Sequence, residues 1–284
     1  MSNAIAVSIV PGELRLLVAG GNGDMKPLHR LARELPPGAV RAGLRSPNVV
    51  DPAAVGGVLE ELAGEARVGR ERGGMVSVLV PDAAARMALL PLEGADPSRA
   101  EGEAMARWAL GDLLPVDAAA ARVDWSIIAE QGQEPAVGWL LAFGADPLVI
   151  EEYESVVQQL GWTPGRVVPL TLALAVGARD IVDDDSPGTA RVVISGFGGQ
   201  AACLVEAAGV PRLHRAWRGG QPDLAHELAA IGRYTEQRLE LTVVEAVVAG
   251  PGPWRSRAAA GCEALGWRVH TRSRWAAHIG AVQP

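Results

Sequence analysis

Apolar residues gather along this chain in short runs that predict strands and in wider-spaced patterns that predict helices. Residues 4–10 and 13–18 are apolar runs on either side of Pro11-Gly12, which is the pattern of two strands joined by a tight turn. Proline and glycine are frequent over residues 35–52, which favours a loop there. Asp51-Pro52 then predicts the start of a helix, because aspartate caps helices and proline fits their first turn.

The middle of the chain predicts further strands and helices in alternation. Residues 75–81 form an apolar run, and residues 85–92 predict a partner strand for it after a turn at Asp82. Beyond them we expect a helix over 97–114, strands over 122–129 and 138–145, a helix over 147–160, a strand over 166–168 and a helix over 170–181. The acidic residues 183–185 and the Ser-Pro-Gly after them predict the main boundary, as a solvated linker rather than a metal site.

After that boundary, the predicted order of strands, glycine turn and helices resembles that of the first part of the chain. Residues 189–210 predict a strand, a glycine turn and a second strand. We then expect a helix over 223–239, a strand from 244 that ends in a glycine loop, a helix over 257–265 and a last strand over 267–272. The alternation of strands and helices predicts an α/β protein.

The composition narrows the class of protein. With 284 residues, of which 49% are hydrophobic, the chain can bury a large core as one domain or as two lobes. The net charge of −7 argues against nucleic acid as the main partner. The apolar runs are shorter than the roughly 20 residues that span a bilayer, and the N-terminus lacks the pattern of a signal peptide, so an intracellular protein is expected.

Reactive side chains are sparse. Cys203 and Cys262 are too few and too far apart for a disulfide framework or a zinc site, and both are expected to be buried. The five histidines show no metal-binding spacing, and no Ser/His/Asp arrangement stands out. Hydrolase chemistry is therefore unsupported.

Strands that run into glycine turns are the most informative pattern. They occur at 7–18, at 192–205 and at 247–252. Glycine lets backbone N–H groups approach an anion without a Cβ clash, so two such hairpins facing each other could hold phosphates. A third loop could pass beside an adenosine.

The order of these turns resembles that of the actin-like ATPase superfamily, and within it the PilM-like proteins of type IV pilus assembly, relatives of FtsA and of the cytoplasmic domain of GspL. VSVLVPDAAARMALLPLEG, the helix that ends in LLPVDAA, VDWSIIAE and the segment from Trp139 to Ala175 resemble the family in that order. The resemblance implies a ribonuclease H-like fold of two lobes, 1–185 and 186–284. It also implies an inserted subdomain of the FtsA/PilM type at about 75–146 and, because about one helix separates WRGG from VEAVVAG, a reduced second lobe.

Departures from the family pattern predict a pseudo-ATPase. Where nucleotide-binding members carry the aspartates that organise Mg²⁺, this chain has serines, whose neutral oxygen cannot replace a carboxylate. The first turn also offers a proline, which has no N–H donor, and the adenosine loop holds two prolines. The predicted degenerate nucleotide positions are Ser8, Pro11, Gly12, Ser195, Gly196, Gly198, Gly199, Gly250 and Gly252. No catalytic residue, metal or cofactor is expected, and weak ATP binding is left open.

The resemblance implies a scaffold at the cytoplasmic face of the inner membrane, without a membrane span of its own. Its partner would be the short cytoplasmic N-terminal tail of a PilN-like bitopic membrane protein, with the pilus motor ATPase as a second partner. The groove for the tail is placed at Val78, Val80, Leu89 and Trp108.

Two other functions stay open. An active ATPase or small-molecule kinase of the superfamily would need a carboxylate near the nucleotide, for which Glu13, Glu206 or Asp124 are the candidates. A filament-forming protein of the cytoskeletal kind is the third hypothesis.

Overall fold

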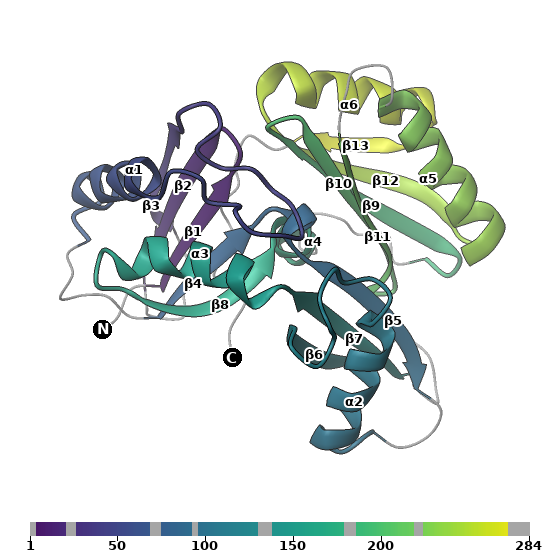
Figure 1. Ribbon diagram of the computed structural model, residues 1–284. Helices are drawn as coiled ribbons and strands as arrows, with labels where there is room; N and C mark the ends of the chain where they lie inside the picture. The colour runs from purple at the N-terminus through teal and green to yellow at the C-terminus, as the bar shows by residue number, and fades with distance from the viewer. Residues whose placement is uncertain are drawn as a thin grey trace. The chain divides into compact units, whose positions relative to one another are not determined.

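The computed structural model describes residues 4–20, 27–68, 75–92, 96–129, 138–178, 186–218 and 224–271. Their strands form two five-stranded sheets and one three-stranded sheet (Figure 1). One compact unit contains the described residues of 1–84 and 148–178, and the second unit contains those of 85–147 and 179–272. No helix in the described ranges is long and apolar enough to cross a membrane.

The first sheet has the strand order β3-β2-β1-β4-β8. Its strands are β1 (Ala4–Val10), β2 (Glu13–Ala19), β3 (Pro27–Glu34), β4 (Met75–Val80) and β8 (Thr163–Pro169). β1, β2 and β3 pair antiparallel, whereas β1, β4 and β8 pair parallel. The sheet is therefore mixed, with an antiparallel meander on one side of β1 and parallel strands on the other.

Helices α1 (Pro52–Glu65) and α3 (Pro147–Gln158) pack against this sheet. The predicted cap forms, because the Asp51 carboxylate accepts a hydrogen bond of 2.9 Å from the Ala54 N–H. Apolar residues of both helices join the alternate residues of β1 and β2 in one core, so the helices cover the same face of the sheet.

The proline- and glycine-rich loop before α1 is tied to α3 by buried polar groups. The Glu152 carboxylate accepts hydrogen bonds from the N–H groups of Asn48 and Val49, and the Asn48 side chain accepts one of 2.8 Å from the Gly43 N–H. The Tyr153 hydroxyl donates to the same amide, and burial raises the pKa of Tyr153. This stretch is the loop that the sequence predicts, and these side chains hold its shape together with a few backbone hydrogen bonds.

Helix α4 (Leu170–Ala178) begins at a buried carboxylate. Asp82, which is 4% exposed, accepts from both the N–H and the hydroxyl of Thr171, the latter at 2.7 Å. A negative charge is favourable at a helix N-terminus, where free N–H groups point outward. Asp82, predicted only as a turn residue, thus also fixes the start of α4.

The second sheet repeats the first, with the order β11-β10-β9-β12-β13. Its elements are β9 (Thr189–Phe197), β10 (Gln200–Ala207), β11 (Val210–Arg218), α5 (Leu224–Leu239), β12 (Thr242–Ala249), α6 (Gly252–Ala264) and β13 (Arg268–Thr271). α5 and α6 pack on one face, and the core beneath them contains both buried cysteines, Cys203 and Cys262.

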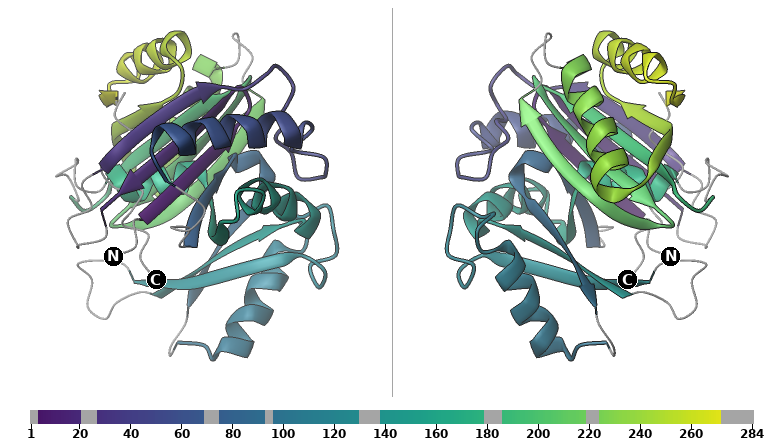
Figure 2. Two further views of the ribbon diagram at one scale, coloured as in Figure 1. Left: turned by 90° about the vertical axis from the view of Figure 1, so that its left-hand side faces the viewer. Right: turned by 90° about the vertical axis from the view of Figure 1, so that its right-hand side faces the viewer.

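The third sheet, of order β5-β7-β6, is formed by β5 (Arg86–Leu92), β6 (Arg122–Ala129) and β7 (Gly138–Ala145). Helix α2 (Arg99–Leu110) covers one of its faces (Figure 2). The strand boundaries of β6 and β7 are those predicted. The prediction that 75–81 and 85–92 pair was wrong, since β4 belongs to the first sheet and β5 to the third. The short helix η2 (Asp82–Ala84) separates them, so the inserted sheet begins after residue 84 rather than at 75.

The structure differs from the sequence expectations at further points. Strands β3 and β11 were not expected, and α6 begins at Gly252 rather than at 257. Pro251 and Pro253, predicted to stiffen a loop, lie instead at the start of that helix, where a missing N–H costs nothing. The compact units also differ from a division at residue 185, since the third sheet groups with the second sheet. The acidic run 183–185 lies outside the described residues.

Candidate functional site

The first glycine turn lies between β1 and β2, where Val10 pairs with Glu13. Gly12 has a φ of 85°, which only glycine adopts readily, and Pro11 contributes no N–H. The Gly12 carbonyl accepts a hydrogen bond of 3.1 Å from the Leu35 N–H. Because Pro11 has no N–H, the turn offers an anion one backbone donor fewer than a turn without proline would.

The second glycine turn joins β9 to β10. Gly198 and Gly199 have φ values of 55° and 77°, so both central residues of this two-residue hairpin are left-handed. Here glycine is required by the turn geometry itself. Phe197, just before the turn, is 8% exposed.

The remaining glycines of the predicted site pack against a tryptophan. A Cβ atom built on Gly196 would lie 2.1 Å from Cε2 of Trp254, at the start of α6. A Cβ atom on Gly250 would lie 2.6 Å from Cε3 of the same indole and 2.7 Å from the Gly196 carbonyl oxygen. The Trp254 ring thus occupies the space beside both glycines. Glycine at these positions is explained by tight packing, and Gly252 belongs to α6.

Ser8 and Ser195 occupy equivalent places in the two sheets. Each lies three residues before the first residue of its turn, and each is 3% exposed. The Ser8 hydroxyl has no hydrogen-bond partner among the described residues. The structure therefore brings the two serines to matching positions within their sheets.

The three carboxylates that an active enzyme could have used are engaged elsewhere. Glu13 forms a close ion pair with Arg15. Glu206 forms a buried ion pair of 3.0 Å with Arg191. Asp124 lies on β6 and accepts a hydrogen bond of 2.9 Å from the Trp125 N–H. No cluster of three or more metal-ligating side chains occurs within the described ranges.

The four residues predicted to line a partner groove differ in exposure and do not all belong to a surface. Val78 and Val80 are 0% and 1% exposed and belong to the core of the first sheet, so they offer no surface to a peptide. Leu89 is partly exposed on β5, whereas Trp108 is 77% exposed on α2. Because Ala88 and Leu90 face the core beneath α2, Leu89 points to the opposite face of the third sheet. Leu89 and Trp108 therefore lie on different surfaces.

The face of the third sheet that is turned away from α2 is apolar on β5 and β7, whereas β6 adds Arg122, Asp124 and Ser126 beside Ile128. We call its apolar residues the outer face: Met87, Leu89, Pro91, Ile128, Trp139, Leu141 and Phe143. All of them except Leu141 are partly or fully exposed. At one end the guanidinium of Arg212 from β11 lies 4.7 Å from the centre of the Trp139 ring, within the same compact unit. The sequence prediction missed this face, although β7 is apolar at every position, which indicated that both of its faces are apolar.

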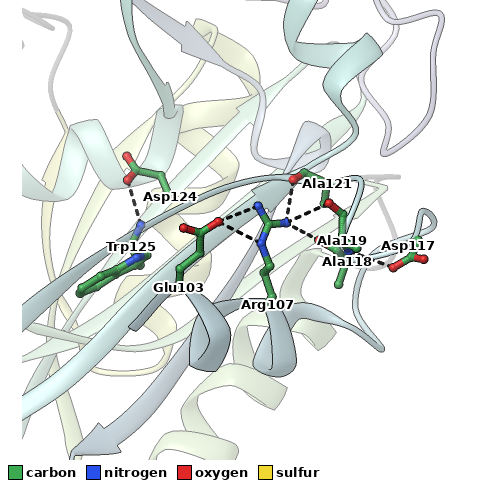
Figure 3. Close-up of polar contacts among 8 residues, drawn as sticks. All are labelled: Glu103, Arg107, Asp117, Ala118, Ala119, Ala121, Asp124 and Trp125. Atoms are coloured by element: carbon green, nitrogen blue, oxygen red, sulfur yellow. Dashed lines mark hydrogen bonds and ion pairs between the residues drawn. The ribbon is translucent and has the colours of Figure 1, made fainter. Parts of the chain in front are cut away.

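A single arginine fixes the loop between α2 and β6 (Figure 3). The Arg107 guanidinium donates to the Glu103 carboxylate at 3.0 and 3.2 Å and to the Ala121 carbonyl at 3.0 Å. It also donates to the carbonyls of Ala118 and Ala119. The helix, the loop and the residue just before β6 are thereby held as one unit.

No protein-family model matches the chain, and no curated protein matches it. Among solved structures, it is similar to PilM of a PilM-PilN type IV pilus biogenesis complex, with a TM-score of 0.72, 17% identity and coverage of 96% of this chain and 88% of the other. It is also similar to the cytoplasmic domain of EpsL, an inner membrane component of the type II secretion system of Vibrio cholerae, with a TM-score of 0.56, 13% identity and coverage of 99% and 94%.

A Bacteroides thetaiotaomicron protein of unknown function, described as having an actin-like ATPase fold, matches with a TM-score of 0.54 and 10% identity over 95% of this chain and 91% of the other. At such identities the likeness concerns the fold. The chain therefore has the actin-like α/β fold with two lobes, as the order of its glycine turns predicted.

Proposed function

We propose that this chain is a cytoplasmic component of a type IV pilus or type II secretion platform at the inner membrane. It binds the short cytoplasmic N-terminal tail of a PilN-like membrane protein and performs no nucleotide chemistry. The solved complex that it resembles contains PilM and PilN, which supports a partner of that kind.

The outer face of the third sheet carries this proposal. Leu89, Leu141 and Phe143 sit side by side on paired strands, since Leu89 is registered with Leu141 and Met87 with Phe143. An extended peptide with apolar side chains is a suitable occupant for such a face, because burial of apolar surface and aromatic anchors supply most of the affinity in interfaces. The tail thus binds on the outer face instead of at Val78 and Val80.

The residues at the degenerate nucleotide positions support the absence of nucleotide chemistry. Ser8 and Ser195 supply no charge for a divalent cation. The space beside Gly196 and Gly250 is taken by the Trp254 indole. A scaffold needs neither the metal nor that space.

Titration with the partner's N-terminal peptide tests the binding proposal. Leu89→Glu should weaken binding by roughly a hundredfold, because it buries a carboxylate in an apolar contact. Trp108→Ala, on the other surface of the same subdomain, is the matched control and should leave the affinity unchanged. Equal binding by wild type and Leu89→Glu would contradict the outer face as the site, and no binding by wild type would contradict the function.

Calorimetry with Mg-ATP tests the second part of the proposal. We expect no saturable heat at millimolar nucleotide. Binding that is lost on replacing Gly198 or Gly199 by a bulky residue would instead revive the ATPase or kinase hypothesis. A fold check by circular dichroism is needed for both variants, since those glycines have left-handed backbone.

A further inference from the structure

The outer surface of helix α2 carries a large apolar ring that the described part of the chain leaves uncovered. Trp108 is 77% exposed, more than any other large apolar residue given for the described ranges. The adjoining turn adds Leu113, which is 43% exposed. Tryptophan is enriched among the residues that anchor interfaces, which makes this exposed ring a candidate contact when its surroundings suit a ligand.

Two exposed carboxylates lie toward the two ends of the helix that carries this ring. Glu101 is on the same side of α2 as Trp108 by helical spacing, two turns before it, and Asp112 lies in the turn that follows α2. Hydrogen bonds from Ser98 lower the pKa of Glu101, so this group is charged at neutral pH. Neither Glu101 nor Asp112 forms an ion pair with any residue that the structure describes.

The basic residues of α2 do not neutralise them. Arg107 is committed to Glu103 and to the carbonyls of the following loop (Figure 3). Arg99 lies on the opposite side of the helix by the same spacing. The exposed side of α2 and the turn after it thus carry one large apolar ring and two negative charges.

This surface is rigid and separate from the outer face. The N-terminus of α2 is closed by a capping box between Ser98 and Glu101, and Arg107 fixes the loop beyond its end. The third sheet lies between Trp108 and Leu89. A ligand on one surface therefore leaves the other open.

We propose that Trp108, Glu101 and Asp112 form a second docking surface, which binds a basic segment of a partner protein. An arginine or lysine of that segment stacks on the indole, and its neighbours pair with the two carboxylates. The complementarity of charge selects this occupant, since a cation is attracted both by the ring face and by the carboxylates. The inference does not depend on the proposed function, because it concerns another surface and another ligand chemistry.

The test uses the full chain labelled with fluorotryptophan, with the Trp108 resonance identified by its loss in Trp108→Phe. The probe is a short synthetic peptide in which arginine alternates with leucine, and the comparison peptide has glutamate in place of arginine. We expect the arginine peptide to shift the Trp108 resonance selectively, and the glutamate peptide to shift nothing. Trp108→Ala and Glu101→Gln/Asp112→Asn should each weaken binding of the arginine peptide roughly tenfold.

Glu60→Gln/Glu61→Gln is the matched control, since it removes the same charge from exposed positions of α1. The affinity of this variant for the arginine peptide should equal that of the wild type. This result would distinguish docking at Trp108 from a general attraction of the peptide to an acidic protein. Equal losses in the two charge variants, or unchanged affinity in Trp108→Ala, would overturn the proposal. A Trp108 shift that grows with protein concentration without peptide would assign the surface to self-association, which also overturns it.

Discussion

The two five-stranded sheets have the same topology but use different residues at matching positions. Next to its turn the first hairpin has Ile9, which is 0% exposed, where the second has Gly196 with the Trp254 indole against it. At the far end of the hairpin, Ala4 pairs with Ala19 in the first sheet. The corresponding pair of the second sheet is Arg191 with Glu206.

This difference shows that one architecture tolerates two ways of filling the same space. In the first sheet the space beside the turn is filled by the side chain of the strand residue itself, Ile9. In the second, a helix supplies the ring that replaces a missing side chain, and an ion pair replaces two methyl groups. Gly196 resembles a ligand-binding residue in the sequence. In the structure it makes room for the Trp254 ring.

The largest expected effect comes from breaking the buried ion pair. Arg191→Ala should cost about 3–5 kcal/mol of unfolding free energy, because Glu206 is left charged and 2% exposed. Arg191→Ala/Glu206→Ala recreates the alanine pair of the first sheet and should cost less than the single variant. Urea unfolding at neutral pH measures both, and a double variant less stable than Arg191→Ala would show that the comparison fails.

Gly196→Ala should cost about 2–3 kcal/mol, because the new methyl group overlaps the Trp254 ring. In a Trp254→Ala background, Gly196→Ala should cost much less than it does in the wild type. The effects of the two changes on unfolding free energy are therefore strongly non-additive. Thermal unfolding of the two single variants and the double variant gives the coupling. Additive losses would mean that the indole does not occupy this space in solution.

Gly12→Ala should cost about 1 kcal/mol, from backbone strain alone, since φ is 85° and no atom lies within 4 Å of the added methyl group. Asparagine, which tolerates this backbone, should cost less than alanine at the same position. The same unfolding assay measures both variants. A loss as large as that of Gly196→Ala would contradict the difference between the two turns.

The smallest expected effect is at the paired serines. Ser8→Ala should be neutral or stabilise the fold by up to about 1 kcal/mol, because the buried hydroxyl is unpaired among the described residues. Ser195 does have an interaction partner, so Ser195→Ala should not stabilise. A marked loss in Ser8→Ala would show that its hydroxyl has a partner in solution.

The sequence was sufficient to predict a strand with a continuous apolar run, such as 138–145, and a strand with alternating apolar and polar residues, such as 122–129. It was not sufficient for β3 and β11, because these edge strands carry arginine and histidine at many exposed positions and show no apolar period. The first turn of α6 was missed for a related reason, since proline indicates both a loop and a helix start.

The candidate site was harder to predict than the fold. Ser8 and Ser195 could be predicted to occupy equivalent positions, because each lies the same number of residues before its glycine turn in the sequence. The packing of Trp254 on Gly196 could not be read, since it depends on where α6 lies against β9. For Val78 and Val80 the sequence indicated apolar strand positions but not which sheet, and hence which core, they join.

The buried cysteines of the second sheet offer a way to follow one half of the molecule alone. The chain contains 2 cysteines, and both Cys203 and Cys262 lie in the core beneath α5 and α6. Burial raises the pKa of Cys262 to about 12, so its thiol is protonated at neutral pH and resists alkylation while folded. The rate of cysteine alkylation therefore reports the opening of that core. The first sheet does not contribute to this rate, because it contains no cysteine.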